Sequence, residues 1–183
     1  MRYISMLRGI NVSGQKKIKM TDLKALYEAL DFAHVITYIQ SGNVVFTAAD
    51  NIDLTALIEA AIQKQYGFDV PVLLRTTQDF DEVIKSCPFT HLDLEATGIE
   101  RNGTKVLVTF LSNAPSDEDV RNVQKYLSPS EAMVVKDKAV YLHCPDGYGK
   151  TKASNVLLEK KLKVLATTRN WKTVRQLFAL ASE

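Results

Sequence analysis

The chain has 183 residues, of which 46% are hydrophobic and 24% charged, and its formal net charge is +2. This composition is typical of a folded globular protein and excludes a disordered or low-complexity chain. No apolar run approaches the roughly 20 residues that span a bilayer. The apolar stretch before Arg8 is also shorter than the roughly 7 to 15 residues of a signal-peptide core. We therefore expect a cytoplasmic protein with no membrane partner.

The first 75 residues predict the order strand, helix, strand, strand, helix, strand, which is typical of a ferredoxin-like fold. The expected strands are rich in β-branched and aromatic residues, and the expected helices repeat apolar residues at helical spacing. Thr21 is expected to cap the first helix, and Gly67 to end the second. The expected strands are 3–7, 35–39, 44–46 and 70–74.

Residues 76–103 differ in character and are expected to connect two halves through a short acidic helix at 79–85 and a loop. In the second half, 104–183, the order strand, helix, strand, strand, helix recurs. Its last helix but one is expected from about Thr151, and a final helix from about Asn170 replaces the last strand. We predict an α+β protein of two subdomains, a ferredoxin-like βαββαβ half at 1–75 and a related βαββα half with an extra C-terminal helix.

Three stretches resemble a bacterial family known only as a domain of unknown function: LRGINVSG at 7–14, YIQSGNVVF at 38–46 and ATTRNWKTV at 166–174. A fourth, GYGKTKASN at 147–155, is similar to a related segment of that family. The resemblance implies a two-part α+β fold with a ferredoxin-like N-terminal half, and it transfers no activity and no catalytic residue. Ser13 departs from the pattern, because a second glycine is expected there, and a positive φ would strain a serine.

Basic residues gather at both ends of the chain. Residues 1–24 contain six Lys or Arg against one acid, and residues 147–183 contain eight against two. Residues 79–100, by contrast, contain six acids against one base. Either these charges are scattered over unrelated solvated faces, or the two basic ends form one anion-binding surface.

The loop from Arg8 to Lys19 is the first candidate binding site. It follows an expected strand and combines Gly, Asn and positive charge, as anion-binding loops do, but it lacks the GK[ST] ending of a P-loop. It is either an irregular surface loop or a contact for a phosphate group. The sequence alone does not place the turn at 40–43 beside it. The candidate ligand-binding residues of the loop and the turn are Arg8, Asn11, Lys16, Lys17, Gln40 and Asn43.

The stretch CPDGYGKT at 144–151 ends like a P-loop. However, Cys144 stands in place of the first glycine and Pro145 has no N–H, so we expect no hydrolysis of nucleoside triphosphates. Two candidate residues remain there, Lys150 and Lys152. They either hold a phosphate at the start of the following helix or are ordinary solvated lysines.

The stretch ATTRNWKTVRQL is the third candidate. Asn170 is expected to cap the last helix. Trp171, the only tryptophan, either packs this helix onto the second half or stacks on a nucleic-acid base. In the second case Arg169 and Arg175 would contact phosphates beside it.

Cys87 and Cys144 form no CxxC pair and are expected to be buried, reduced thiols. The histidines are scattered without metal-ligand spacing, so we expect no metal site and no cofactor. The aromatic motif of RNA-recognition modules is also absent. Three functions stay open: a binding module for a nucleotide or nucleic acid, a small enzyme acting on a phosphorylated metabolite at the junction of the halves, and an interaction domain that forms a homo-oligomer.

Overall fold

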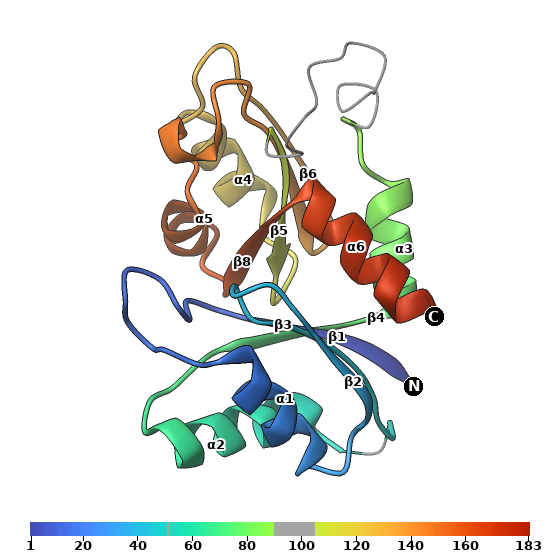
Figure 1. The fold of residues 1–183 in the computed structure, drawn as a ribbon. Helices are drawn as coiled ribbons and strands as arrows, with labels where there is room; N and C mark the ends of the chain where they lie inside the picture. The colour runs from blue at the N-terminus through green and yellow to red at the C-terminus, as the bar shows by residue number, and fades with distance from the viewer. Residues whose placement is uncertain (51, 90–104) are drawn as a thin grey trace. The chain divides into compact units, whose positions relative to one another are not determined.

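The computed structural model describes residues 1–50, 52–89 and 105–183, and these residues form two compact units. Unit 1 comprises Met1–Asp81 and Leu177–Glu183, and unit 2 comprises Glu82–Gln176. Each unit contains a four-stranded antiparallel sheet with helices packed against it (Figure 1). The predicted α+β class is therefore confirmed.

Unit 1 has the predicted order of elements. They are β1 (Arg2–Leu7), α1 (Met20–Glu28), β2 (Ala33–Tyr38), β3 (Asn43–Thr47), α2 (Leu54–Tyr66), β4 (Val72–Thr76) and the start of α3 (Thr77–Lys85). The sheet has the strand order β2-β3-β1-β4, and each neighbouring pair is antiparallel. Helices α1 and α2 lie on the same side of this sheet (Figure 1).

Alternate residues of β1 face the core of unit 1. Tyr3 and Leu7 belong to the cluster of buried side chains that includes those of α1 and α2. Phe46 of β3 is fully buried in it, and its ring centroid lies 5.3 Å from that of Tyr27 and 4.7 Å from that of Phe32. Such aromatic pairs contribute about 0.5–1.5 kcal/mol beyond the burial of their area. This core fixes the end of β1 and the start of α1, and so fixes both ends of the loop between them.

Unit 2 repeats the order of elements in unit 1. They are β5 (Val106–Leu111), α4 (Asp117–Gln124), β6 (Ala132–Lys136), β7 (Ala139–His143), α5 (Asn155–Leu162) and β8 (Ala166–Asn170), followed by α6 (Trp171–Ser182). The sheet order β6-β7-β5-β8 corresponds to that of unit 1. The hydrophobic core includes Leu107, Val140 and Leu158, from two strands and α5.

The sequence pattern does not predict β8, and the expectation that a helix replaces the last strand is wrong. The residues of β8, ATTRN, lack the alternation of apolar and polar side chains that is typical of a strand. Polar residues are tolerated there because their side chains form hydrogen bonds with neighbouring residues. Thr168 Oγ1 lies 2.8 Å from Thr109 Oγ1, and Arg169 donates to Thr167 Oγ1 at 2.7 Å. Unit 2 is therefore a complete βαββαβ unit followed by α6.

The helix expected from about Thr151 begins four residues later. A single 3-10 turn covers Tyr148–Lys150, Thr151 is extended, and Ser154 caps α5 through its side chain. The acidic helix expected at 79–85 corresponds to α3. The loop expected after it lies largely at 90–104, outside the described residues.

Cys87 and Cys144 are both buried and free, as predicted. Burial raises the pKa of the Cys144 thiol to about 11, so this thiol stays protonated at neutral pH and is a poor nucleophile. Within the described part of the chain, no helix has the length and apolar character needed to cross a membrane.

Candidate functional site

The loop between β1 and α1, residues 8–19, is called the basic loop below, and its tip is a small hairpin. Asn11 N donates to Lys16 O at 3.2 Å, and Gln15 N donates to Val12 O at 2.9 Å. The two residues at the tip, Ser13 and Gly14, have φ of +51° and +76°. Positive φ at both central residues is the pattern of a type I′ hairpin turn, which favours glycine or asparagine. The strain that the sequence suggested for a serine at position 13 is therefore present.

The side chain of Asn11 joins the basic loop to the turn after β2. Its Nδ2 donates to Gln40 O and to Ile18 O, both at 2.9 Å, and its Oδ1 accepts from Ile18 N at 2.9 Å. Both N–H bonds of the amide are thus used within the protein. The turn and the loop, which sequence alone did not place together, are adjacent, and Asn11 holds the loop rather than offering its amide N–H groups to a ligand.

The turn approaches the loop closely at Gly42. This residue has φ +77°, and a Cβ built on it would lie 2.6 Å from Ile10 Cδ1. Asn43 is fully buried, and its Nδ2 donates to Tyr38 O and Ser41 Oγ, both at 3.0 Å. Asn43 therefore stabilises the turn, and its burial removes it from the set of ligand contacts.

The other side of the basic loop is tied to the segment before β4. Lys16 Nζ donates to Asp69 O at 2.6 Å, and Arg8 N donates to Pro71 O at 2.9 Å. The Lys16 ammonium group is therefore also used to fix the loop. The basic loop is thus anchored on both of its sides by hydrogen bonds within unit 1.

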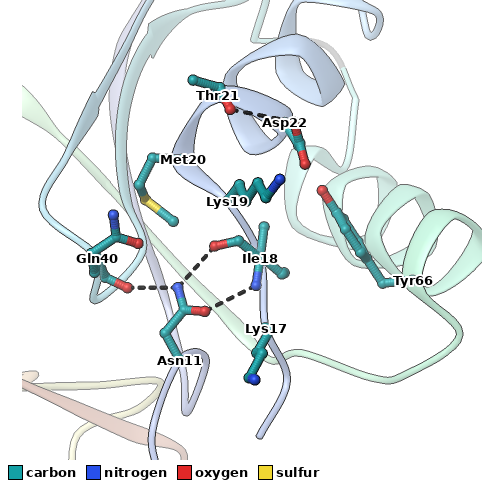
Figure 2. A pocket seen from close by; sticks show the side chains of 9 residues that line it. All are labelled: Asn11, Lys17, Ile18, Lys19, Met20, Thr21, Asp22, Gln40 and Tyr66. Carbon is teal, nitrogen blue, oxygen red and sulfur yellow. Dashed lines mark hydrogen bonds between the residues drawn. The ribbon is translucent and has the colours of Figure 1, made fainter. Parts of the chain in front are cut away.

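A pocket of about 530 Å³ opens between the basic loop, the start of α1 and the end of α2 (Figure 2). Among the described residues, the ammonium groups of Lys17 and Lys19 form no hydrogen bond or ion pair within the protein. The pocket is lined by Asn11, Lys17, Ile18, Lys19, Met20, Thr21, Asp22, Gln40 and Tyr66. The structure thus brings together Asn11, Lys17 and Gln40 of the predicted set.

The first turn of α1 faces this pocket without a side-chain cap. Lys19 occupies the N-cap position, in place of the expected Thr21, and makes no capping hydrogen bond. Helix N-termini carry a partial positive charge, which Asp22 in the first turn offsets in part. Burial, and next the charge of Asp22, raises the pKa of Tyr66, so its phenol keeps its proton and remains a hydrogen-bond donor.

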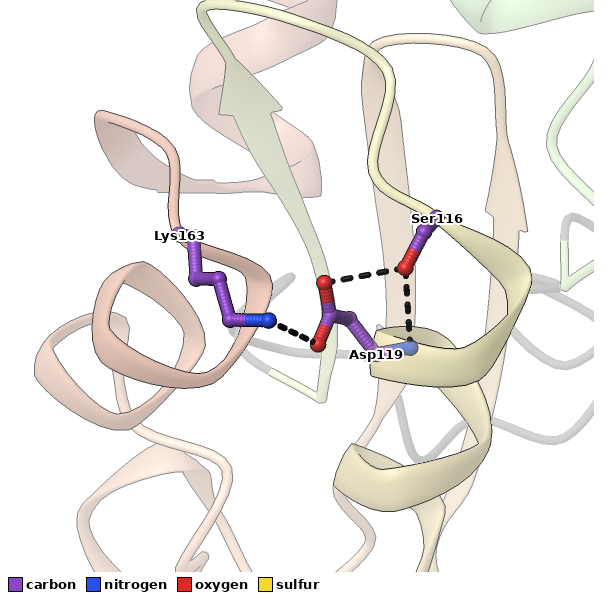
Figure 3. A network of polar contacts seen from close by, with 3 residues as sticks. All are labelled: Ser116, Asp119 and Lys163. Carbon is purple, nitrogen blue, oxygen red and sulfur yellow. Dashed lines mark hydrogen bonds and ion pairs between the residues drawn. The ribbon is translucent and has the colours of Figure 1, made fainter.

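The corresponding helix start in unit 2 is closed by its own side chains (Figure 3). Ser116 Oγ accepts from Asp119 N at 3.1 Å and donates to Asp119 Oδ2 at 2.9 Å. Lys163 Nζ donates to Asp119 Oδ1 at 2.9 Å. These bonds, from Lys163 first and then from Ser116, lower the pKa of Asp119.

The P-loop-like segment of unit 2 does not place its lysines at a helix start. Lys150 and Lys152 are exposed and precede the cap of α5. Two of the first three N–H groups of that helix are already bonded: Asn155 N donates to Tyr148 Oη at 2.7 Å, and Leu157 N donates to the side chain of the capping serine at 3.4 Å. The hypothesis of a phosphate at this helix start is therefore not supported.

The third candidate segment is mostly buried. Arg169 and Trp171 are 8% and 4% exposed, so neither side chain offers a surface on which a base could stack. The burial of Trp171 agrees with the other interpretation, in which it packs the last helix in place. Desolvation lowers the pKa of Arg169 to about 10, so it remains charged at neutral pH. Asn170 Oδ1 accepts from Thr173 N at 2.8 Å and caps α6 as predicted. Arg175 is exposed.

The sequence missed two notable residues of the pocket, Asp22 and Tyr66. Asp22 has the pattern of an ordinary first-turn acid, and Tyr66 lies more than forty residues away at the end of another helix. Only the packing of α2 beside α1 brings them together. Across residues 1–50, 52–89 and 105–183, no three His, Cys, Asp or Glu side chains are grouped to hold a metal ion.

Known proteins resemble this chain in sequence and in fold. A family described as "Protein of unknown function (DUF1697)" matches residues 1–141, which confirms the predicted resemblance. The conserved bacterial protein SP0830 from Streptococcus pneumoniae is similar in structure, with 23% identity, a TM-score of 0.68 and 98% of each chain covered. At this identity the likeness shows a shared fold. No curated protein matches the chain significantly.

Proposed function

The chain belongs to the DUF1697 family of proteins of unknown function, and we propose that it binds a small phosphate-bearing ligand in the pocket beside the basic loop. The observation that carries this proposal is the presence, in the lining of a pocket, of two lysines, Lys17 and Lys19, whose ammonium groups have no partner among the residues that the structure describes. The pocket volume, about 530 Å³, lies within the range of roughly 300–1,000 Å³ typical of small-molecule sites.

The anchored loop supports this proposal. A site whose loop is already ordered binds with a smaller loss of conformational entropy than one that must fold around its ligand. Asn11 and Lys16 supply this order through bonds to Gln40 O, Ile18 O and Asp69 O. Lysine ammonium groups bind phosphate as compact point charges. The basic loop therefore divides its polar residues between holding the loop and facing the pocket.

Isothermal titration calorimetry with ribose 5-phosphate tests the proposal. We expect saturable binding by the wild type and at least tenfold weaker binding by the double variant K17A/K19A. The matched control is K150A/K152A, which removes two exposed lysines of unit 2 and is expected to bind like the wild type. Circular dichroism checks that each variant is folded.

Two results would contradict the proposal. One is the absence of binding by the folded wild type at millimolar ribose 5-phosphate. The other is an equal loss of affinity in both double variants, because that result would indicate a general charge effect rather than a site at the basic loop.

A further inference from the structure

The two ends of the pocket differ in chemistry. In Figure 2, Lys17 lies at one end, Asp22 and Tyr66 lie at the other, and Lys19 lies between them. A bare phosphate would use only the cationic end. The remaining lining must therefore suit another part of the ligand.

Asp22 limits what this other part can be. A carboxylate accepts hydrogen bonds and repels a second anionic group close to it. Thr21 Oγ1, 3.3 Å from Asp22 Oδ1, is placed to donate to this carboxylate. The opposite end of the ligand is thus expected to carry hydroxyl or amino donors and no negative charge.

Tyr66 adds an aromatic surface beside Asp22. Its ring is stacked on that of Phe68, with the ring centroids 5.8 Å apart and an angle of 26° between the ring planes. The packing holds the ring in place at the edge of the pocket. Ile18 and Met20 supply further apolar lining. An aromatic ring beside apolar side chains favours a planar, weakly polar group such as a nucleobase.

Resting on the proposed function, we infer that the ligand is a nucleoside monophosphate, with its phosphate at Lys17 and Lys19 and its base or ribose hydroxyls at Tyr66 and Asp22. A phosphate ester, a planar ring and neutral hydrogen-bond donors occur together in this ligand class. A single-stranded nucleic acid would place further phosphates beyond the first nucleotide, and the carboxylate of Asp22 disfavours them at that end.

Calorimetry with AMP, GMP, CMP and UMP, against ribose 5-phosphate, tests this inference. We expect at least one mononucleotide to bind at least tenfold tighter than ribose 5-phosphate. In the Y66L variant this advantage should disappear, so that the mononucleotides bind no tighter than ribose 5-phosphate does. Y66F, which retains the ring, should keep most of it, and Y126L in unit 2 is the control for loss of a surface tyrosine.

The outcomes separate this inference from the proposed function. If ribose 5-phosphate binds as tightly as all four mononucleotides, the inference is wrong and the phosphate site remains. If a ten-residue single-stranded RNA binds tighter than every mononucleotide, and K17A/K19A abolishes that binding, the ligand is a nucleic acid and the inference is again wrong. If no phosphate compound binds, both proposals are wrong.

Discussion

The connection between the first strand and the first helix differs between the two units. In unit 2, five residues, 112–116, join the first strand to the first helix, whereas in unit 1 the basic loop uses twelve, 8–19. The short connection is closed by Ser112, which donates its N–H to Leu165 O at 2.9 Å and accepts from Leu165 N through Oγ at 3.1 Å. Because this order of elements needs only five residues there, the additional length in unit 1 is not required by the fold.

The helices that follow these two connections also differ in how their first turns are capped. In unit 2, Ser116, Asp119 and Lys163 satisfy one another at the start of α4 (Figure 3). In unit 1, the start of α1 has no side-chain cap and borders a pocket with Lys17 and Lys19 (Figure 2). One helix start is thus closed by its own side chains, and the other has no side-chain cap and borders the pocket of the proposed ligand site.

The largest expected effect comes from Gly42→Ala, which breaks the contact between the turn and the basic loop. A Cβ would lie 2.6 Å from Ile10 Cδ1, and the residue has φ +77°. Overpacking and left-handed strain together predict a loss of about 2–4 kcal/mol in the free energy of unfolding. The control is Gly67→Ala, with the same φ but nothing within 4 Å, for which strain alone predicts about 1 kcal/mol. Equal losses in urea unfolding would contradict this account.

Asn11→Ala is expected to have the next largest effect. It removes two hydrogen bonds to Ile18 within the loop and one to Gln40 of the turn, and it places alanine at φ +54°. We expect a loss of about 2 kcal/mol. Asn11→Asp keeps the acceptor and tolerates the left-handed backbone, so it should lose less. Faster hydrogen exchange of the loop amides in both variants would support the bridging role, and unchanged exchange would argue against it.

The closed helix start of unit 2 is tested by Ser116→Ala, for which loss of the cap predicts about 1 kcal/mol. Lys19→Ala at the equivalent position of unit 1 should have almost no effect on stability, because no cap is lost. Chemical denaturation at pH 7 measures both. A loss in Lys19→Ala as large as that in Ser116→Ala would remove the distinction between the two helix starts.

The same network predicts a pH dependence. The folded pKa of Asp119 is lowered, so its contribution to stability is present above its unfolded pKa, about 4, and is lost as the pH falls through the folded value. The stability difference between the wild type and Asp119→Asn should therefore shrink as the pH is lowered below about 4. A difference that stays constant between pH 7 and pH 2 would contradict this coupling.

The smallest effect is expected at the tip of the basic loop. Ser13→Gly relieves the strain of φ +51° but adds flexibility to the unfolded chain, so the net gain should be below about 1 kcal/mol. Gly14→Ala, at φ +76°, should instead destabilise by about 1 kcal/mol. Thermal unfolding of the two variants should shift in opposite directions.

Much of the fold could be predicted from the sequence, because most elements carry their own periodicity and turn residues. The strand β8 could not, because its sequence lacks an alternating pattern. Only the structure shows that Thr168 Oγ1 lies 2.8 Å from Thr109 Oγ1 and that Arg169 donates to Thr167 of its own strand. The basic loop could also be found, from its glycines and lysines. The roles within it could not, because whether Asn11 binds a ligand or the turn depends on where Gln40 lies. Tyr66 gave no sequence signal, since packing alone brings it to the pocket.

The most direct test of the central claim is a ¹H–¹⁵N NMR titration of the wild type with ribose 5-phosphate. If the basic loop that distinguishes unit 1 is the ligand site, the amide signals that shift will be those of residues 16–22 and Gln40. The signals of residues 112–119 and 150–155 in unit 2 will stay in place. Shifts confined to unit 2, or no shifts at saturating ligand, would contradict the claim.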